Sequence, residues 1–497
     1  MNTEEYVKYD GLGLAELVKA KEVTPEELVD LAISQIDKYN PKINAVIHTM
    51  YEQAKMSAAE DFKGPFAGVP MLLKDFSQEL KGEPKSGGSK ALRNFRSESD
   101  SEYVIRLRES GFLFLGQTNV PELAITAYTE PAEYGPTRNP WNHDFTPGGS
   151  SGGSGAAVAS GMVPIAGAND GGGSIRIPAA YCGLFGLKPS RGRTPVGPRF
   201  ARFLQGAAVE HVLTRSVRDS AAVLDQLKAM EKGAAFTAPQ FDESYLQILD
   251  KPLNKQRKIA FSVKSPIGTH VDPECVEAVK KTVGYLERCG FQVEEVDAPV
   301  DGKKIANSFL TMYFAEVSAT LASMETVLGR KASYRDVEPT TYMMGLLGKA
   351  ISAQDFVLSM REWDIAGYAM ESFHDEYDFY ITPTTAYPPA KIGEHALKSF
   401  EKLALQVTGK MGSASLLKKM GIIDQMVENS LKRVPFTQLA NLTGQPAMSV
   451  PLHITKAGLP LGVQFMAAMG REDLLLQMAH FLEESDLWEN VQNKCML

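Results

Sequence analysis

A segment rich in glycine and serine, residues 148–193, constrains the fold of this chain more than any other feature. It reads GGSSGGSGAAVASGMVPIAGANDGGGSIRIPAAYCGLFGLKPSRGR. Such composition is common in flexible linkers. Here, however, the glycine clusters flank a small-residue helical pattern at 156–159 and an apolar run at 163–166 that is typical of a buried strand. Glycines between packed elements indicate positive φ angles or close backbone approach, so we expect an ordered, site-bearing segment.

Helical and strand patterns alternate along the rest of the chain, which predicts an α/β fold. The segment Thr24-Pro25-Glu26-Glu27 combines a capping threonine, a proline at the first helical position and a capping-box glutamate, so a helix is expected to start there. We expect a large mixed, mainly parallel twisted β-sheet flanked by α-helices. The expected strands are 44–50, 68–75, 112–115, 163–166, 258–263, 291–296 and 379–382, and further helices are expected over 101–109 and 273–288.

The length of 497 residues would suit about three average domains. Because neither a linker nor an internal repeat is visible, we expect one domain over residues 1–497. Residues 306–375 and 397–431 have helical, methionine-rich patterns, and these methionines suit either core filling or a pliable substrate pocket. We expect residues 300–435 to cap the substrate pocket, with Tyr313, Tyr342 and Met343 as candidate lining residues.

Composition excludes several function classes. The formal net charge of −8 argues against nucleic-acid binding. The first ten residues do not resemble a signal peptide, and 18 consecutive apolar residues occur nowhere, so a cytoplasmic protein without a membrane partner is expected. Four cysteines at scattered positions fit neither a zinc pattern nor a disulfide framework, and free thiols are expected.

The first glycine cluster contains a G-x-S-x-G match at residues 149–153, which would make Ser151 a hydrolase nucleophile. That motif needs a strand entering the serine, whereas residues 144–149 predict a turn. Residues 153–155 give only a poor dinucleotide fingerprint, and a Walker-type lysine is missing. We therefore favour neither Ser151 as a nucleophile nor nucleotide binding.

The second cluster places Ser174 at the exit of a predicted strand. The three glycines before it, at 171–173, can present successive backbone N–H groups to one point, as an oxyanion hole requires. Glycine runs also form plain turns, and the pattern by itself leaves both interpretations open.

A serine nucleophile needs a base. None of the eight histidines lies in a motif that pairs it with a serine and an acid. Lys74 ends an apolar run, where burial could lower its pKa by the roughly three units that a base at neutral pH needs. The alternative is that Lys74 simply pairs with a carboxylate such as Asp75.

Together these residues resemble the amidase signature family. The matching segments are GGSSGGS at 148–154, DGGGSIRIP at 170–178 and CGLFGLKPSRGR at 182–193, with further matches at 68–75, 118–122, 135–141, 215–217 and 441–446. The resemblance covers nearly the whole chain.

The resemblance implies a role for each serine. Ser174 would be the acyl-enzyme nucleophile, and Ser150, 24 residues earlier, would be the bridging serine in a cis peptide bond. Lys74 would be the base that acts through Ser150. Ser151 would have a supporting role.

The resemblance also assigns the glycine loop. Gly171, Gly172 and Gly173, with the N–H of Ser174, would form the oxyanion hole. Asp170 and Arg176 would hold this loop in place. The family commonly has threonine where Asn169 stands and a small hydroxylated or branched residue where Gly171 stands, so a looser loop is expected here.

The implied activity is hydrolysis of the C–N bond of a small-molecule amide, without metal or cofactor. Residues 169–170 and 470–477 resemble hydrolases of cyclic aminohexanoate oligomers within the family. A homodimer is left open. The alternative is a glutamine-dependent amidotransferase subunit that supplies ammonia to a tRNA-linked substrate.

Overall fold

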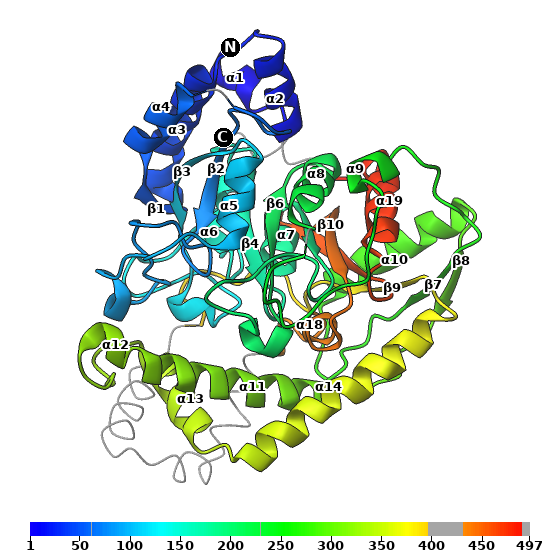
Figure 1. Cartoon of the computed structure of the whole chain (residues 1–497). Helices are drawn as coiled ribbons and strands as arrows, with labels where there is room; N and C mark the ends of the chain where they lie inside the picture. The colour runs from blue at the N-terminus through cyan, green and yellow to red at the C-terminus, as the bar shows by residue number, and fades with distance from the viewer. Residues whose placement is uncertain (61, 229, 396–430, 490–497) are drawn as a thin grey trace.

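One sheet of 11 strands runs through the computed structural model, which describes residues 1–60, 62–228, 230–395 and 431–489 (Figure 1). Its strand order is β1-β3-β2-β4-β6-β5-β10-β11-β9-β7-β8. The strands are β1 Val46–Thr49, β2 Pro70–Lys74, β3 Leu113–Thr118, β4 Ile165–Asp170, β5 Phe185–Lys188, β6 Val209–Thr214, β7 Lys258–Phe261, β8 Gln292–Glu295, β9 Phe379–Pro383, β10 Ala447–Ile454 and β11 Pro460–Met466.

The sheet is mixed, as expected, but the expectation of mainly parallel pairing is wrong. Among the described strands, six neighbouring pairs are antiparallel and four are parallel. The antiparallel pairs come largely from β5, β6, β10 and β11, whose sequences gave no strand prediction. These strands are buried along almost their whole length, so they lack the alternation that marks a half-exposed strand.

Helices cover the sheet, which confirms the α/β class (Figure 1). The helix expected at Thr24 is present, and Thr24 and Glu27 form the capping box with Pro25 in the first turn. The helices are α1 Thr3–Tyr6, α2 Gly11–Lys19, α3 Pro25–Ile43, α4 Tyr51–Ala58, α5 Glu102–Glu109, α6 Gly152–Ala159, α7 Arg176–Cys182, α8 Val217–Leu227, α9 Tyr245–Ile248, α10 Pro273–Arg288, α11 Gly302–Ser323, α12 Glu325–Leu328, α13 Pro339–Lys349, α14 Ala353–His374, α18 Gln438–Thr443 and α19 Glu472–Glu483, with short 3₁₀ turns η1 Lys90–Leu92, η2 Glu122–Ala124 and η3 Phe203–Gly206.

The helical region expected after residue 300 is present as α11 to α14. Helix α11 packs against α13, α14 and α18, and these helices lie below the sheet in the view of Figure 1. The second methionine-rich pattern falls mainly at 396–430, outside the described residues. Over the described part of the chain, no helix combines the length and apolar character needed to cross a membrane.

The sheet brings the two glycine-rich clusters to the end of β2. Strands β2 and β4 are parallel neighbours, with Met71 opposite Ile165, so both end at the same edge of the sheet. Strand β6 runs antiparallel beside β4 and begins at that edge, with Val209 opposite Asp170. Lys74, the last residue of β2, therefore lies close to the residues at the end of β4.

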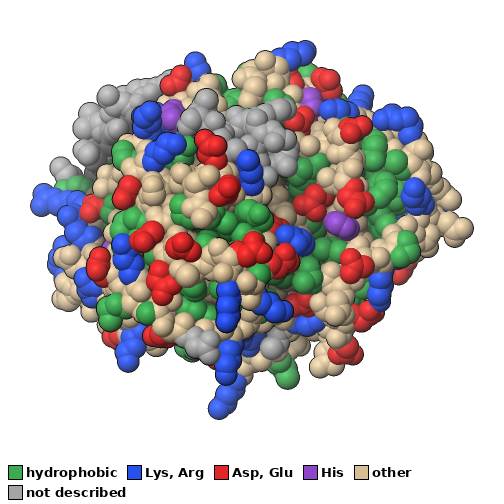
Figure 2. Space-filling model, turned by 90° about the horizontal axis from the view of Figure 1, so that it is seen from above, with side chains coloured by type: hydrophobic (Ala, Val, Ile, Leu, Met, Phe, Trp, Pro, Cys, Tyr) green, Lys and Arg blue, Asp and Glu red, His purple; other side chains and the backbone are tan. Residues whose placement is uncertain are grey.

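Charges on the face drawn in Figure 2 are mixed, with Lys and Arg interspersed among Asp and Glu. Cys182, Cys275 and Cys289 are thiols, as expected. Cys495 lies outside the described residues.

Candidate active site

Lys74 is the centre of a buried polar cluster at the edge of the sheet. Its Nζ donates hydrogen bonds to Ser150 Oγ at 2.8 Å, Ser151 Oγ at 2.9 Å and Asn169 Oδ1 at 2.6 Å. The side chain is fully buried. The alternative that Lys74 pairs with Asp75 is wrong, because the Asp75 carboxylate instead accepts hydrogen bonds from the hydroxyl and main-chain N–H of Ser86.

Burial lowers the pKa of Lys74 to about 7, while the negative charges of Glu210 and Asp170 act in the opposite direction. Three neutral oxygen acceptors surround the amine. A lysine whose pKa is lowered to this range is able to serve as a general base at neutral pH.

The Gly149–Ser150 peptide bond is cis, as the resemblance implied. Ser150 and Ser151 are both buried against Lys74. The main-chain N–H of Ser151 donates to the main-chain oxygen of Ser174 at 3.4 Å. The two clusters, distant in sequence, are therefore adjacent in space.

Ser174 follows the glycine run and is half-buried. Of the expected oxyanion donors, the N–H of Gly173 already has an acceptor, because it donates to Asp170 Oδ1 at 2.7 Å. The N–H groups of Gly171, Gly172 and Ser174 make no such bond to other described residues. Gly173 instead supplies the bend, with a φ of +122°.

Asp170 and Arg176 form a fully buried ion pair beneath the glycine loop. Arg176 donates to the two carboxylate oxygens at 2.9 Å each. Burial opposes ionisation of Asp170, but the guanidinium of Arg176 outweighs it and holds the pKa of Asp170 below its usual range. The carboxylate also accepts from the N–H groups of Gly173 and Ile175, so this pair fixes the shape of the loop.

Three residues in the C-terminal part of the chain also bind Arg176, and the sequence patterns predicted no role for them. The guanidinium also donates to Thr437 O at 2.8 Å, Gln464 Oε1 at 2.7 Å and Asn441 Oδ1 at 2.6 Å. Asn441 lies within a segment of the family resemblance, which was the available signal.

Leu204 lies against the glycine loop at position 171. A Cβ at position 171 would lie 2.5 Å from Leu204 Cδ1, so Leu204 fills the space that a larger residue would take. The carbonyl of Gly172 accepts from Thr437 Oγ1 at 2.6 Å. The side chain of Asn169 accepts a hydrogen bond from Lys74.

Of the candidate pocket residues, Tyr313 contacts a residue beside the loop. Its ring stacks on Phe309, and Phe309 would meet a Cβ at Gly172 within 2.7 Å. Met343 is buried in the same apolar cluster as Phe309. Tyr342 contacts Tyr334 in a separate cluster.

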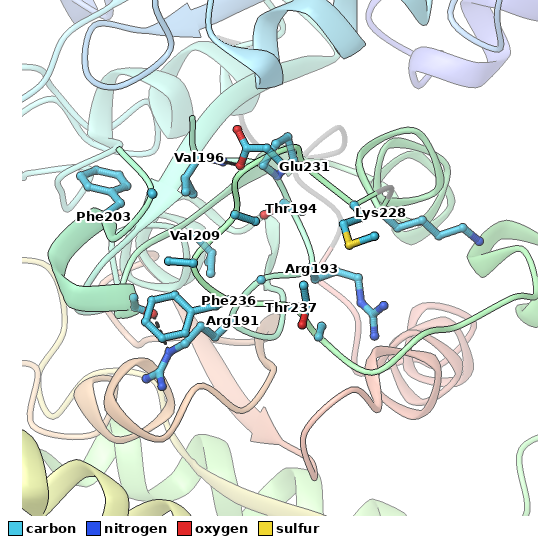
Figure 3. A pocket seen from close by; sticks show the side chains of 18 of the residues that line it. Arg191, Arg193, Thr194, Val196, Phe203, Val209, Lys228, Glu231, Phe236 and Thr237 are labelled. Atoms are coloured by element: carbon cyan, nitrogen blue, oxygen red, sulfur yellow. Dashed lines mark hydrogen bonds between the residues drawn. The ribbon is translucent and has the colours of Figure 1, made fainter. Parts of the chain in front are cut away.

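A cavity of about 540 Å³ is lined in part by residues of η3 and of the start of β6 (Figure 3). Val209, which pairs with Asp170, lines it. Its lysine and arginine side chains already have partners: Lys228 pairs with Asp225, and Arg193 with Glu472. Across the described residues, no group of three or more His, Cys, Asp and Glu side chains is arranged to hold a metal ion.

Comparisons with known proteins identify the family. A family model for amidases matches residues 27–476. The chain belongs to the amidase signature family. Lipoamidase from Enterococcus faecalis is 36% identical over 97% of this chain, although the chain spans only 64% of that relative's length. The 6-aminohexanoate-cyclic-dimer hydrolase from Pseudomonas sp. (strain NK87) is 35% identical over 96% of this chain and 95% of the relative.

Solved structures of the amidase signature family are similar over nearly the full chain. A 6-aminohexanoate cyclic dimer hydrolase complexed with substrate has a TM-score of 0.89 at 33% identity and covers 99% of this chain and 100% of the other. A bacterial aryl acylamidase has a TM-score of 0.85 at 27% identity and covers 98% of each chain. The protein is thus an amidase, a hydrolase of amide C–N bonds.

Proposed function

We propose that this amidase works through an acyl-enzyme on Ser174, with Lys74 as the base and Ser150 as the proton relay. The observation that carries this proposal is the 2.8 Å hydrogen bond from Lys74 Nζ to Ser150 Oγ in a fully buried cluster. The lowered pKa of Lys74, about 7, leaves a substantial fraction of the amine neutral at neutral pH.

The reaction begins when neutral Lys74 takes a proton from Ser150, which in turn takes the proton of Ser174. The Ser174 oxygen attacks the amide carbonyl and forms a tetrahedral intermediate. The same relay returns the proton to the leaving nitrogen, because an amine anion is a poor leaving group. Water then attacks the acyl-enzyme by the same route.

The developing oxyanion would be stabilised by backbone N–H groups, with Gly171, Gly172 and Ser174 as the donors. Gly173 is left out because its N–H already binds Asp170. Pre-organised donors of this kind are each worth roughly 3–4 kcal/mol in the transition state. The Asp170–Arg176 pair supports this role by fixing the loop before substrate binds.

The substrate class we propose is a secondary amide of a flexible, medium-length acyl chain, such as the cyclic dimer of 6-aminohexanoate. Two similarities support it: the full-length match to cyclic dimer hydrolases and the high structural similarity to one complexed with substrate. Helices α11 to α14 would supply part of the pocket cap. The sheet is continuous from β1 at one edge to β8 at the other, which supports a single domain.

Covalent trapping tests this proposal. In one experiment, wild-type protein is incubated with a fluorophosphonate probe. In a second, it is quenched in acid during turnover of the cyclic dimer or of aryl amides. In both, the modified peptide is identified by mass spectrometry. Label and acyl group are expected on Ser174 and absent from Ser174→Ala. Labelling of Ser151, or turnover by Ser174→Ala, would contradict the mechanism.

The amidotransferase alternative receives less support. A glutamyl-tRNA(Gln) amidotransferase component from Thermotoga maritima has a TM-score of 0.71 at 26% identity, against 0.89 at 33% for the cyclic dimer hydrolase. We therefore retain simple hydrolysis as the proposed reaction.

A further inference from the structure

Glu210 is a buried carboxylate behind Lys74 that the mechanism above does not use. It lies on β6, opposite Asn169 of β4, and is 1% exposed. One carboxylate oxygen accepts a short hydrogen bond from Ser77 Oγ, and the other accepts from Gln78 Nε2 at 2.9 Å. An acidic side chain is buried this completely only when its oxygens are satisfied.

Two hydrogen-bond chains connect Glu210 to Lys74. In the first, Lys74 Nζ donates to Asn169 Oδ1 at 2.6 Å, and Asn169 Nδ2 donates to Ser77 Oγ at 2.6 Å. In the second, the main-chain N–H of Lys74 donates to Gln78 Oε1 at 2.8 Å. Since Ser77 and Gln78 both donate to Glu210, the two chains close a ring around the end of β2.

The Gln78 amide links the main chain of Lys74 to the Glu210 carboxylate. The main-chain N–H of Lys74 can only donate, which fixes the orientation of the Gln78 amide and leaves its nitrogen facing the carboxylate. Glu210 Oε2 therefore accepts from Gln78, whereas the single proton of the Ser77 hydroxyl lies within reach of both Glu210 Oε1 and the main-chain oxygen of Phe76. The fit is tight, because a Cβ at Gly167 would lie 2.1 Å from Gln78 Oε1.

We propose that Glu210 is a positioning residue for catalysis: through the Asn169–Ser77 and Gln78 chains it holds Lys74 against Ser150, and its negative charge helps Lys74 retain a proton during the reaction. This inference rests on the proposed function of Lys74 as the base. A relay base needs this help because its protonated form must survive, buried, until the proton reaches the leaving amine.

Other charged and titratable groups also face this pair. Asp170 acts on Lys74 in the same direction as Glu210. Among the described residues, Lys85 and Tyr103 also interact with the Glu210 charge. Burial raises the pKa of Glu210 to about 7, whereas the hydrogen bonds from Ser77 and Gln78 and the charge of Lys74 favour its ionised form.

The test is the pH dependence of Ser174 labelling by a fluorophosphonate probe in Glu210→Gln. This substitution keeps the shape of the side chain and removes its charge. The labelling rate rises with pH as Lys74 becomes neutral. Without the carboxylate the ammonium is less stable, so the midpoint should move down by about one pH unit. A merely structural contact would lower the rate without moving the midpoint.

Glu231→Gln is the matched control. Glu231 is a partly buried carboxylate that accepts from the main-chain N–H groups of Val196 and Gly197, outside the ring. The pH midpoint of Ser174 labelling in Glu231→Gln should equal that of the wild type. Circular dichroism checks that each variant is folded. Glu210→Asp retains the charge, so its midpoint should stay near the wild-type value while the plateau rate falls.

A wild-type midpoint in Glu210→Gln would overturn the inference while leaving the proposed function intact. Absence of Ser174 labelling in the wild type would instead overturn the proposed function. If Glu210→Gln does not fold, Ser77→Ala is measured in its place, because loss of the Ser77 hydroxyl interrupts the hydrogen-bond chain through Asn169. Its plateau rate should fall and its midpoint should move in the same direction by a smaller amount, and a profile identical to the wild type would contradict the inference.

Discussion

The guanidinium of Arg176 binds the carboxylate of Asp170 through two hydrogen bonds of 2.9 Å each, and both side chains are fully buried. Asp170 ends β4 and Arg176 begins α7, so the pair spans the base of the glycine loop between them. Bidentate pairs of this kind fix orientation as well as distance. The loop that presents Ser174 is therefore shaped before any substrate arrives.

Asp170→Asn should destabilise the protein and inactivate it. The guanidinium of Arg176 would be left as a buried charge without its counter-ion, which costs about 3–5 kcal/mol. Urea denaturation followed by circular dichroism measures the free energy of unfolding. Asp144→Asn, at an exposed aspartate, serves as the control and should stay within about 0.5 kcal/mol of the wild type. A fully stable, active Asp170→Asn protein would show that the pair does not hold the loop.

Much of the site could be predicted because its signals are local. Ser174 follows a buried strand and a glycine run, and Lys74 ends an apolar strand, so each could be placed at a sheet edge from neighbouring residues alone. Their pairing through Ser150 came from the family resemblance. The capping box at Thr24 was equally local and is present as predicted.

The rest of the site depends on contacts that sequence patterns do not contain. Asn441 contacts Asp170 from 271 positions away. Glu210 lies in β6, whose burial on both faces hid the strand, although a charge within an apolar segment is itself a sign of a buried partner. Asn169 was interpreted as a change in the loop, because only the folded sheet brings its amide to Lys74.

The pH profile of the wild type should reflect Lys74. Its pKa is lowered by burial to about 7, and only the neutral amine can act as a base. The value of kcat/KM should therefore rise with pH through a midpoint near 7 and be about tenfold below its plateau at one pH unit under that midpoint. Initial rates between pH 5.5 and 8.5 in buffers of constant ionic strength measure it. A flat profile over that range would exclude Lys74 as the titrating base.

Asn169→Asp should move the midpoint of this pH profile to a higher pH. The new carboxylate would stand at the 2.6 Å contact with Lys74 Nζ and stabilise the ammonium, which raises the pKa of Lys74 by about one to three units. Activity at pH 7 should fall about fivefold or more and recover as the pH increases. Asn169→Ala adds no charge, so it should lose activity without this recovery. Equal pH profiles for the two variants would refute the electrostatic explanation.

Gly171→Ala tests whether Leu204 sets the space beside the loop. The added methyl group would lie 2.5 Å from Leu204 Cδ1, and overpacking of this kind costs about 1–3 kcal/mol. We expect kcat/KM to fall about tenfold with the shift of the loop. Leu204→Ala removes the clashing atoms, so the double variant should regain most of the loss relative to Leu204→Ala alone. A double-mutant cycle on kcat/KM measures this coupling, which should reach about 1 kcal/mol. Additive effects would mean that Leu204 does not restrain the loop at Gly171.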